Sequence, residues 1–232
     1  MKTLLITGAN RGIGLEFCRQ YAFAGWHILA CCRHPDKADA LNKLAAQHPD
    51  LITIHALDVT DHAQIEHLGQ ALSNETIDLL INNAGIYPAS DKGGFGHTDY
   101  AEWKAAFRIN AMTPLKMVET FVKQIARSDL KLIVTITSQM GSVADNSSGG
   151  SYLYRSSKAA ANIVVKSLAV DLKEKGIIAV AFNPGWVKTD MGGPDAMITV
   201  EQSVRDMRKV IDGLTLANTG KFIGNDGLEI PW

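Results

Sequence analysis

Tyr154 and Lys158 lie four residues apart in the segment Tyr-Arg-Ser-Ser-Lys. On a helix, residues at this spacing share a face, so the two side chains point the same way. A tyrosine whose pKa is about 10 is a poor acid–base catalyst near neutral pH. A neighbouring ammonium and the positive N-terminal end of a helix both favour the phenolate, so we expect them to lower the pKa of Tyr154. The pair is therefore suited to exchanging a proton with a carbonyl or alcohol oxygen, although the same spacing also occurs in helices without a catalytic role.

Two further polar residues are candidates for the same site. Ser138 directly follows the apolar run 131–137, and Asn110 interrupts the apolar face of a helical segment over 99–126. A buried asparagine requires hydrogen-bond partners, which a reaction site would supply. The alternative for Asn110 is a structural role in a helix kink or in holding a water molecule.

A glycine-rich segment, Thr-Gly-Ala-Asn-Arg-Gly-Ile-Gly, follows the first apolar run and opens a helical segment at residues 12–24. Gly8, Gly12 and Gly14 would permit a tight turn and a close approach of the backbone to a pyrophosphate. The free N–H groups at the start of the helix would then hold the anion. The spacing Gly-x-x-x-Gly-x-Gly differs from the commoner Gly-x-Gly-x-x-Gly. Its position between a strand and a helix favours a dinucleotide site over a plain turn.

Two arginines indicate which dinucleotide is bound. Arg11 lies inside the glycine-rich segment, and Arg33 follows the second apolar run, where dinucleotide-binding folds contact the adenosine ribose. An acidic residue there would bind a free 2′-hydroxyl, and none occurs between His27 and Pro35. Because arginine suits a 2′-phosphate, we predict a preference for NADP(H) over NAD(H). The alternative is that both arginines lie on a solvated rim.

The elements that must position these residues alternate along the chain. The predicted strands are 3–7, 27–32, 51–56, 77–81, 131–137 and 177–182, and the predicted helices are 12–24, 36–47, 61–73, 99–126 and 152–175. Mostly apolar runs without alternation indicate parallel strands covered on both faces. The pattern predicts an α/β fold, a Rossmann-type doubly wound parallel sheet of about seven strands with helices on both faces, in one domain over residues 1–232.

Two segments interrupt the alternation. Residues 86–98 are rich in glycine, and residues 184–198 begin with Pro-Gly and contain Met-Gly-Gly-Pro. Both follow predicted strands, so both should lie at the carboxyl edge of the sheet, where open α/β sheets bind ligands. We predict that they are the substrate loops.

The whole chain resembles the short-chain dehydrogenases/reductases, in their single-domain branch. The matching pieces occur in family order over residues 3–190: Thr7-Gly-x-x-x-Gly12-x-Gly14, Asp58, Asn82-Asn83-Ala84-Gly85, Asn110, Ser138, Tyr154 with Lys158, and Pro184-Gly185. Within the family, the pair Cys32-Arg33 and the segment 226–232 are similar to the C-factor-like, carbonyl-reductase-like branch. The resemblance implies an oxidoreductase that transfers hydride between a nicotinamide and a carbonyl or alcohol, and the two arginines make NADP(H) the expected cofactor.

The resemblance also implies a role for each matching residue. Tyr154 would be the acid–base, and Lys158 would lower its pKa and hold the nicotinamide ribose. Ser138 would orient the substrate oxygen, and Asn110 would anchor a proton-relay water. The predicted cofactor-binding residues are Gly8, Asn10, Arg11, Gly12, Ile13, Gly14, Arg33, Asp58, Val59, Asn82, Ala84, Gly85, Tyr154, Lys158, Pro184, Gly185, Val187 and Thr189.

The composition argues against several other classes of protein. A formal net charge of −1, with 46% hydrophobic and 20% charged residues, is ordinary for a globular protein and gives no basic excess for nucleic acid or an anionic membrane. No apolar stretch approaches the roughly 18 residues of a membrane span, and the N-terminal residues do not resemble a secretory signal. The three cysteines and seven histidines show no disulfide or metal-ligand spacing. We therefore expect a cytoplasmic protein without a metal site.

The residues next to the matching motifs indicate what kind of substrate could bind. These pocket candidates are Tyr87, Gln139, Met140, Tyr152, Trp186 and Met191. They are mainly apolar and aromatic and include no arginine cluster, which favours an uncharged carbonyl or alcohol over a polyanion. The alternative is that they only fill gaps between loops. The segment from Met191 to the helix near Thr199 is shorter than the usual helical lid of the family, which implies an open pocket.

Two other classes of protein fit the sequence less well than an oxidoreductase. A dinucleotide-binding signalling protein with little turnover could lose its catalytic side chains freely. All four candidate catalytic residues are nevertheless present, namely Asn110, Ser138, Tyr154 and Lys158. An epimerase or dehydratase of the extended branch would need a substantial C-terminal substrate domain, for which too little chain follows Asp190. The favoured function is therefore that of an oxidoreductase.

A homo-oligomer is also expected. The predicted helices over 99–126 and 152–175 carry more apolar residues than one buried face requires, and many members of the family that the chain resembles pair these two helices about a two-fold axis.

Overall fold

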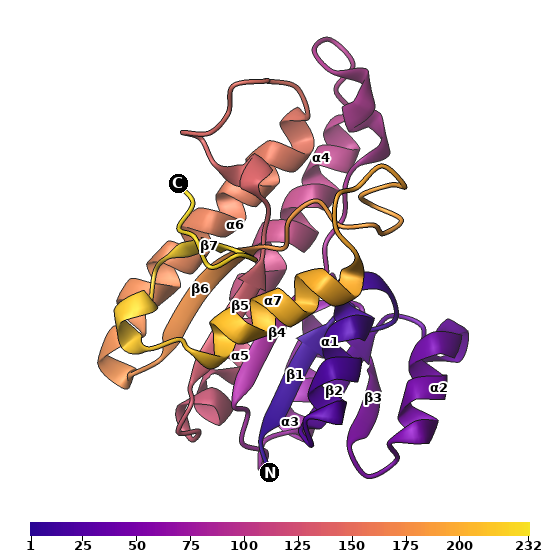
Figure 1. Cartoon of the computed structure of the whole chain (residues 1–232), viewed down its shortest axis with the longest axis vertical. Coiled ribbons are helices and arrows are strands. Elements are labelled where there is room, and N and C mark those ends of the chain that lie inside the picture. Colours follow the sequence, from indigo (N-terminus) through magenta and orange to yellow (C-terminus); the bar gives the residue numbers. More distant parts are fainter.

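The computed structural model describes residues 1–232, with Lys92 and Gly93 of the predicted loop 86–98 described at the level of the backbone only. Seven strands form one parallel sheet in the order β3-β2-β1-β4-β5-β6-β7 (Figure 1). They are β1 (Thr3–Thr7), β2 (His27–Cys32), β3 (Ile52–Ala56), β4 (Leu79–Asn82), β5 (Leu132–Ile136), β6 (Ile178–Asn183) and β7 (Phe222–Gly224). The predicted doubly wound sheet is confirmed.

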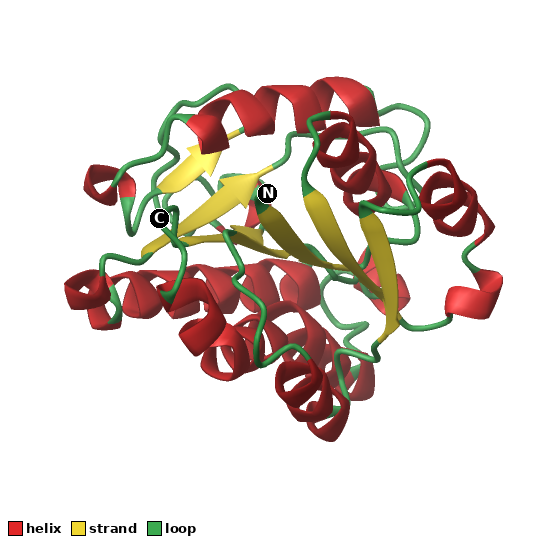
Figure 2. Cartoon of the chain, turned by 90° about the horizontal axis from the view of Figure 1, so that it is seen from below, coloured by secondary structure: helices red, strands yellow, loops and turns green.

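Helices cover both faces of this sheet (Figure 2). They are α1 (Gly12–Phe23), α2 (Asp39–Gln47), α3 (His62–Ala71), α4 (Tyr100–Phe107), α5 (Thr113–Ala126), α6 (Tyr152–Asp171) and α7 (Val200–Asp212). The cluster of buried residues on one face includes side chains of α1, α2 and α7, and the cluster on the other includes those of α3, α5 and α6. Within the described part of the chain, none of the helices has the length and apolar character needed to cross a membrane.

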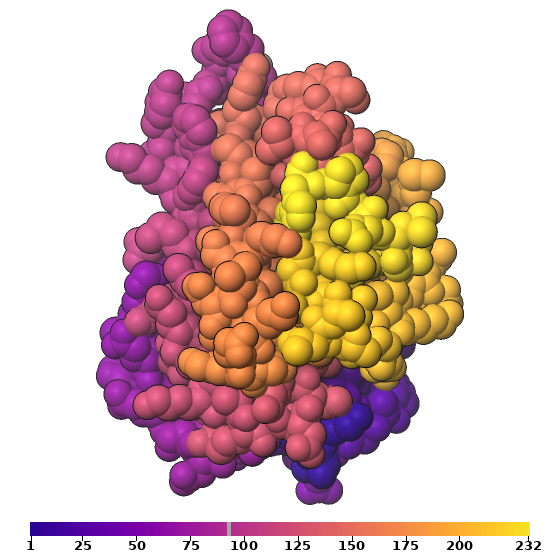
Figure 3. Space-filling view, turned by 90° about the vertical axis from the view of Figure 1, so that its left-hand side faces the viewer, coloured from indigo at the N-terminus to yellow at the C-terminus, as the bar shows by residue number. Residues whose placement is uncertain are grey.

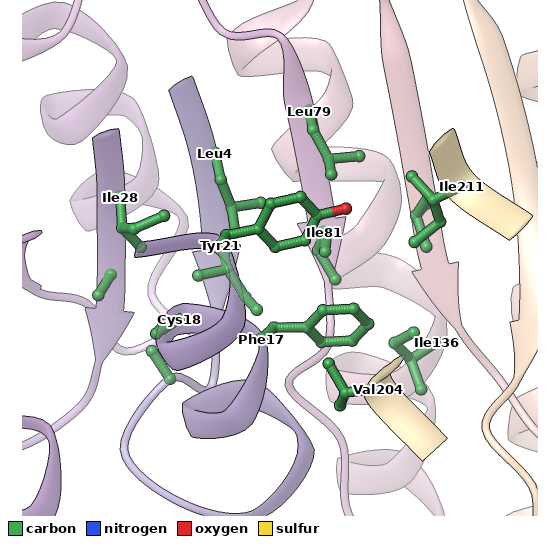
Figure 4. Close-up of a cluster of buried hydrophobic side chains, with 14 of the residues drawn as sticks. Leu4, Phe17, Cys18, Tyr21, Ile28, Leu79, Ile81, Ile136, Val204 and Ile211 are labelled. Carbon is green, nitrogen blue, oxygen red and sulfur yellow. The ribbon is translucent and has the colours of Figure 1, made fainter. Parts of the chain in front are cut away.

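The sheet holds the two layers together because its strands are apolar on both sides. Successive side chains of a strand point to opposite faces, so Leu4 and Ile6 join one buried cluster while Leu5 joins the other. The side chains drawn in Figure 4 belong to the first cluster, and its labelled residues are Leu4, Phe17, Cys18, Tyr21, Ile28, Leu79, Ile81, Ile136, Val204 and Ile211. A fully buried side chain such as Phe17 contributes roughly 1.5–3 kcal/mol to folding.

The observed elements differ from the predicted ones at specific places. The predicted helix 99–126 is divided into α4 and α5 by a π-helical turn at Arg108–Met112, and the predicted helix 152–175 ends at Asp171, with a 3-10 turn at Lys173–Lys175. The segment 36–47 likewise begins as a 3-10 turn, Pro35–Lys37, before α2. Strand β7 was not located because three residues are too few to form a pattern.

The C-terminal residues cover the edge of the sheet at β7. Ile230 donates its N–H to the carbonyl of Phe222, and the ring of Trp232 stacks on that of Phe222 with centroids 5.6 Å apart. The N–H of Ala144 donates to the carbonyl of Trp232 at 3.0 Å. Figure 3 shows this yellow C-terminal segment against the orange surface of α6. An edge strand that would otherwise expose unpaired backbone groups is thereby protected.

The order of the strands determines where a ligand can bind. β1 lies between β2 and β4, so the chain leaves the carboxyl ends of β1 and β4 in opposite directions along the sheet. Such a switch point leaves a crevice outside the carboxyl edge. The glycine-rich segment follows β1, the segment 86–98 follows β4, and the segment 184–198 follows β6. All three predicted loops therefore lie at this edge.

Candidate active site

The turn between β1 and α1 is shaped by its glycines. Gly8 has a φ of +67°, and a Cβ on Gly14 would lie only 2.2 Å from the carbonyl oxygen of Gly8. The start of α1 therefore packs directly on the turn that precedes it. Arg11 is the N-cap residue of α1 and makes no capping hydrogen bond with its side chain. The first amides of α1 thus lack the usual side-chain acceptor, as an anion site at a helix N-terminus requires.

The end of β4 is fastened to this turn. Asn83 donates from Nδ2 to the carbonyl oxygens of Thr7 at 2.9 Å and Gly8 at 3.1 Å. The hydroxyl of Thr7 accepts from the N–H groups of Asn83 and Ala84. Asn82, a predicted cofactor-binding residue, is buried in the sheet, with its side chain 3.5 Å from the hydroxyl of Thr135. Asn83, which was not in the predicted binding set, therefore shapes the turn, while the side chain of Asn82 supports the sheet.

Arg11 forms an ion pair with Asp190, which lies in the segment after β6. Both side chains are exposed, so the pair joins the glycine-rich turn to the segment 184–198 at the surface. A Cβ on Gly12 would lie 3.5 Å from Cγ2 of Thr189, which places the same two segments in contact beside the start of α1. The predicted residues Gly12, Arg11 and Thr189 are thus neighbours.

Arg33 and Asp58 lie at the same edge, beyond β2 and β3. Arg33 is exposed directly after β2, and Asp58 follows the buried Leu57. Burial raises the pKa of Asp58, but hydrogen bonds from the N–H and hydroxyl of Thr60 and the nearby Arg33 outweigh it and leave this pKa below its usual range. Asp58 is therefore a charged acceptor close to the guanidinium of Arg33.

Tyr154, Ser138 and Lys158 come together beside these segments. Tyr154 is in the first turn of α6, is 7% exposed and lies close enough to the side chain of Ser138, which follows β5, for that side chain to lower its pKa. Lys158 is one turn further along α6, and its Nζ lies 5.7 Å from the ring centroid of Tyr154. Nζ also donates to the carbonyl of Ile136 at 3.0 Å. The predicted proximity of these three side chains is therefore found.

The pKa values of this pair depart from the expected ones. Burial raises the pKa of Tyr154 to about 12, against a smaller lowering by the nearby side chain of Ser138. Burial lowers the pKa of Lys158 to about 8. The expected lowering of the tyrosine pKa by Lys158 is thus absent from this structure, because desolvation of the phenol dominates and the ammonium is bound to the carbonyl of Ile136.

Asn110 lies in the π-helical turn between α4 and α5 and is 2% exposed. Its Oδ1 accepts from the N–H of Ile86, and its Nδ2 donates to the carbonyl of Ile86 and to the hydroxyl of Ser157, each at 2.9 Å. The side chain therefore joins the segment after β4 to α6. π turns are frequent at functional sites, and here the turn directs a polar side chain into a buried junction. The role of Asn110 in holding a water molecule stays a prediction.

The segment after β4 carries two residues whose contacts sequence reasoning did not foresee. The ring of Tyr87 packs against that of Tyr154 with centroids 4.7 Å apart, and its hydroxyl is 2.7 Å from that of Ser151. The carboxylate of Asp91 is buried and accepts from the backbone N–H groups of Leu153 and Tyr154. An aspartate in a glycine-rich loop carries no sequence signal for capping a helix far along the chain, so only the tertiary structure reveals this contact.

The segment after β6 lies at the same edge of the sheet as the segment after β4. A Cβ on Gly185 would lie 2.8 Å from Cδ1 of Ile198, and Val187 pairs with Ile198 in a β-bridge. Pro184 is buried, and its carbonyl accepts from the hydroxyl of Ser203 at 2.6 Å. Trp186 is exposed and donates from Nε1 to the carbonyl of Gly192. The predicted residues of this segment therefore lie in an ordered loop without a helix before α7.

These residues fit a dinucleotide. The turn around Gly8 and Gly14 leaves no room for side chains, and the first turn of α1 has no side-chain cap. At Gly85, a Cβ would lie 3.4 Å from Nζ of Lys158 and 3.2 Å from Oδ1 of Asn110, so a bare backbone faces these groups. No group of three or more His, Cys, Asp or Glu suited to a metal ion occurs among the described residues.

Comparisons with known proteins agree with this geometry. The family described as short chain dehydrogenase matches residues 2–196. The "C-signal" of Myxococcus xanthus is 44% identical over 156 residues, which cover 67% of this chain and 93% of that relative. The "1-hydroxy-2-glutathionyl-2-methyl-3-butene dehydrogenase" of Rhodococcus sp. is 34% identical, with all of both chains covered.

A solved structure extends the likeness to three dimensions. The structure of NADPH-bound carbonyl reductase from chicken fatty liver superimposes with a TM-score of 0.91 at 34% identity, covering 100% of this chain and 99% of that one. The resemblance inferred from the motifs is thereby confirmed at the level of the family. With its matching sequence, its parallel sheet and its glycine-rich turn, this chain belongs to the short-chain dehydrogenase family.

Proposed function

We propose that this protein is an NADP(H)-dependent short-chain oxidoreductase that transfers hydride between the nicotinamide and an uncharged carbonyl or alcohol substrate. The observation that carries the proposal is the close approach of Tyr154, Ser138 and the buried Lys158 at the sheet edge that also holds the glycine-rich turn. The bound NADPH of the chicken liver carbonyl reductase supports the choice of cofactor. All 232 residues would form one catalytic domain.

The cofactor would lie along the carboxyl edge of the sheet. The amides at the start of α1 would hold the pyrophosphate, and Arg11 with Arg33 would bind the 2′-phosphate. Asp58 and Val59 would contact the adenine, and Lys158 the nicotinamide ribose. The remaining predicted contacts come from Gly8, Asn10, Gly12, Ile13, Gly14, Asn82, Ala84, Gly85, Tyr154, Pro184, Gly185, Val187 and Thr189. Because the side chain of Asn82 is buried against Thr135, its contribution would be indirect.

Side chains of the protein would transfer the proton to or from the substrate oxygen. When bound, the nicotinamide supplies or accepts the hydride at the carbon of the substrate. In reduction, the hydroxyl of Ser138 donates a hydrogen bond to the carbonyl oxygen, and Tyr154 donates its proton to the same oxygen. The ammonium of Lys158, which stays charged below its pKa of about 8, would stabilise the phenolate once Nζ turns from the carbonyl of Ile136 towards the phenol. In oxidation the phenolate takes the proton from the alcohol.

The walls of the site favour an uncharged substrate. Tyr87 packs on Tyr154, and Tyr152, Trp186 and Met191 are exposed at the same edge. Apolar and aromatic surface of this kind binds ketones, aldehydes or quinones more readily than polyanions. The segments 86–98 and 184–198 would be the substrate loops.

The decisive experiment is Tyr154→Phe, assayed by NADPH absorbance against a panel of carbonyl compounds. Loss of the general acid should lower kcat by about 10²–10⁴, while NADPH binding and thermal stability stay nearly unchanged. Tyr100→Phe is the matched control, since it removes an exposed tyrosine hydroxyl from the first turn of another helix, α4, and should leave kcat unchanged. If Tyr154→Phe keeps more than about a tenth of the wild-type kcat, the proposed mechanism is wrong.

A dinucleotide-binding signalling protein is the second candidate. The observation that favours it is the 44% identity with the "C-signal" of Myxococcus xanthus. Such a protein would bind NADPH with the same residues but would reduce no member of the carbonyl panel. Binding without turnover in the wild-type protein would therefore select this candidate.

A further inference from the structure

The N-terminus of α6 is capped by a residue from a distant segment. An N-cap residue normally accepts a hydrogen bond from the second or third amide of its own helix. Ser151 precedes α6, but it has a φ of 44° and makes no side-chain capping bond. Instead the carboxylate of Asp91 accepts from the N–H of Leu153 at 3.1 Å and from that of Tyr154 at 2.8 Å. Asp91 is 4% exposed, so these bonds are shielded from water.

A second contact joins the same two segments. The hydroxyl of Ser151 is engaged with that of Tyr87 at 2.7 Å. The ring of Tyr87 then packs on the ring of Tyr154 with centroids 4.7 Å apart. One segment after β4 therefore holds Tyr154 twice, by its backbone amide through Asp91 and by its ring through Tyr87. In Figure 1 this segment lies at the same end of the molecule as the start of α6.

The charge of Asp91 suits this position. The start of a helix carries a partial positive charge, and a carboxylate there makes short, strong, charge-assisted hydrogen bonds. A buried carboxylate that lost these amides would be left without compensation, so the contact resists opening. The adjacent Ser90 is bound elsewhere, because its N–H and hydroxyl both donate to Glu102 of α4. The junction with α4 and the cap on α6 are therefore separate contacts of neighbouring residues.

We propose that Asp91 is a positioning residue for Tyr154. Its carboxylate fixes the first turn of α6, and thereby the phenol, relative to the wall formed by Tyr87. Asp91 would act through Tyr154 and not by its own contact with substrate or cofactor. This inference rests on the proposed function, because it assigns to the cap a consequence for the acid–base step.

The primary test is Asp91→Ala. We expect kcat to fall about ten-fold or more, since small displacements of a catalytic group are costly, while KM for the carbonyl and the Kd of NADPH change less than about two-fold. Hydrogen exchange of the amides of Leu153 and Tyr154 should become faster. The matched control is Asp99→Ala, which removes the same kind of carboxylate cap from α4 but keeps the cap on α6, and its kcat should stay within about two-fold of wild type. Equal losses of kcat in both variants would overturn the proposal, because the effect would then be a general loosening of helix starts at this end of the molecule.

Asp91→Asn provides the conservative variant. Its single carbonyl oxygen can replace one of the two accepted bonds, so we expect a kcat between those of the wild type and Asp91→Ala, with faster exchange at one of the two amides. If Asp91→Ala does not fold, Asp91→Asn carries the same test. A wild-type kcat together with unchanged exchange in this variant would contradict the role of Asp91.

Tyr154→Phe, measured in parallel, separates the two proposals. If Tyr154→Phe stays active, the proposed acid–base function fails, and with it any consequence of the cap for that step. If Tyr154→Phe is inactive while Asp91→Ala keeps the full kcat, the acid–base function stands and the positioning role fails. Amide exchange reports the cap independently of turnover.

Discussion

The side chain of Lys158 meets two opposing demands at one position. The proposed catalysis by Tyr154 and the proposed binding of a ribose would both favour an ammonium there, whereas burial favours the neutral amine and lowers the pKa of Lys158 to about 8. The carbonyl of Ile136 offsets part of the cost by accepting a hydrogen bond from Nζ. The buried ammonium of Lys158 should therefore lower the free energy of unfolding of the protein without cofactor.

Lys158→Met should therefore stabilise the free protein near neutral pH. Below about pH 8 the folded wild type carries a buried ammonium, so removing it should raise the free energy of unfolding by on the order of 1–3 kcal/mol. Between about pH 8 and the ordinary pKa of 10.5, the unfolded chain holds the proton and the folded chain does not, so wild-type stability rises and the gain should disappear. Urea unfolding at a series of pH values measures this difference, and a gain independent of pH would contradict it. The same variant should bind NADPH more weakly.

Arg33→Asp should reverse the cofactor preference. Each charge-assisted hydrogen bond to the 2′-phosphate contributes about 1.5–3 kcal/mol, so the wild type should bind NADPH roughly ten-fold or more tightly than NADH. A carboxylate at this position would repel the phosphate and accept from a free 2′-hydroxyl. Fluorescence titration gives the dissociation constants of NADPH and NADH. Arg205→Asp is the control, because it makes the same charge change at an exposed side chain of α7. Equal constants for the two cofactors in the wild type would show that the arginines only lie on a solvated rim.

At the scale of elements, the site depends on how closely β1, α1 and β4 approach one another. Asn83 bonds to the backbone of Thr7 and Gly8, and α1 begins where only glycine fits. These contacts fix the start of α1 relative to the sheet, so its amides point consistently at one place. The proposed anion site would thus be a property of the junction between elements and not of a single side chain.

Gly14→Ala tests this junction. The new Cβ would meet the carbonyl of Gly8 at 2.2 Å, and neither backbone can yield without moving the turn. We expect a loss of about 2–3 kcal/mol in unfolding free energy and a large loss of NADPH affinity. Gly213→Ala is the matched control, because a Cβ there would meet its nearest atom at an ordinary 3.6 Å and the φ is −99°. Similar destabilisation by the two substitutions would refute the packing argument.

At the scale of the whole molecule, four large apolar side chains are exposed on one helical layer. The large apolar side chains exposed on the π turn, α5 and α6 are Met112, Leu115, Ile163 and Val170. They lie on the elements that cover the side of the sheet packed by α3, α5 and α6. A second copy related by a two-fold axis would cover this surface with the same surface of its own.

We predict a homodimer or a higher oligomer formed through this face. Light scattering at micromolar concentration should give a mass of about 50 kDa or a multiple of it, from a chain of 25.1 kDa. Ile163→Glu should shift the mass towards the monomer by burying a charge in the interface. Phe23→Glu, at an equally exposed apolar residue on α1, should leave the mass unchanged. A wild-type mass near that of one chain would refute the interface.

Much of the fold was determined by patterns that are local in the sequence. β1 and β2 begin and end at the predicted residues, because buried parallel strands appear as short apolar runs between turn residues. The glycine-rich turn was located by its spacing, and Ser138 was placed at the carboxyl edge because it follows a strand. Local patterns such as these act over a few residues, so they can be read without the rest of the chain.

The remaining features were decided by contacts between distant residues. Asp91 and Tyr154 are 63 residues apart, and no periodicity links a loop carboxylate to the amides of a later helix. The π turn at Asn110 depends on partners in two other segments, and the pKa of Tyr154 depends on burial by all of them. Desolvation and long-range hydrogen bonding are properties of the packed chain. The residue types of the site were therefore set by the sequence, and their protonation and orientation by the tertiary structure.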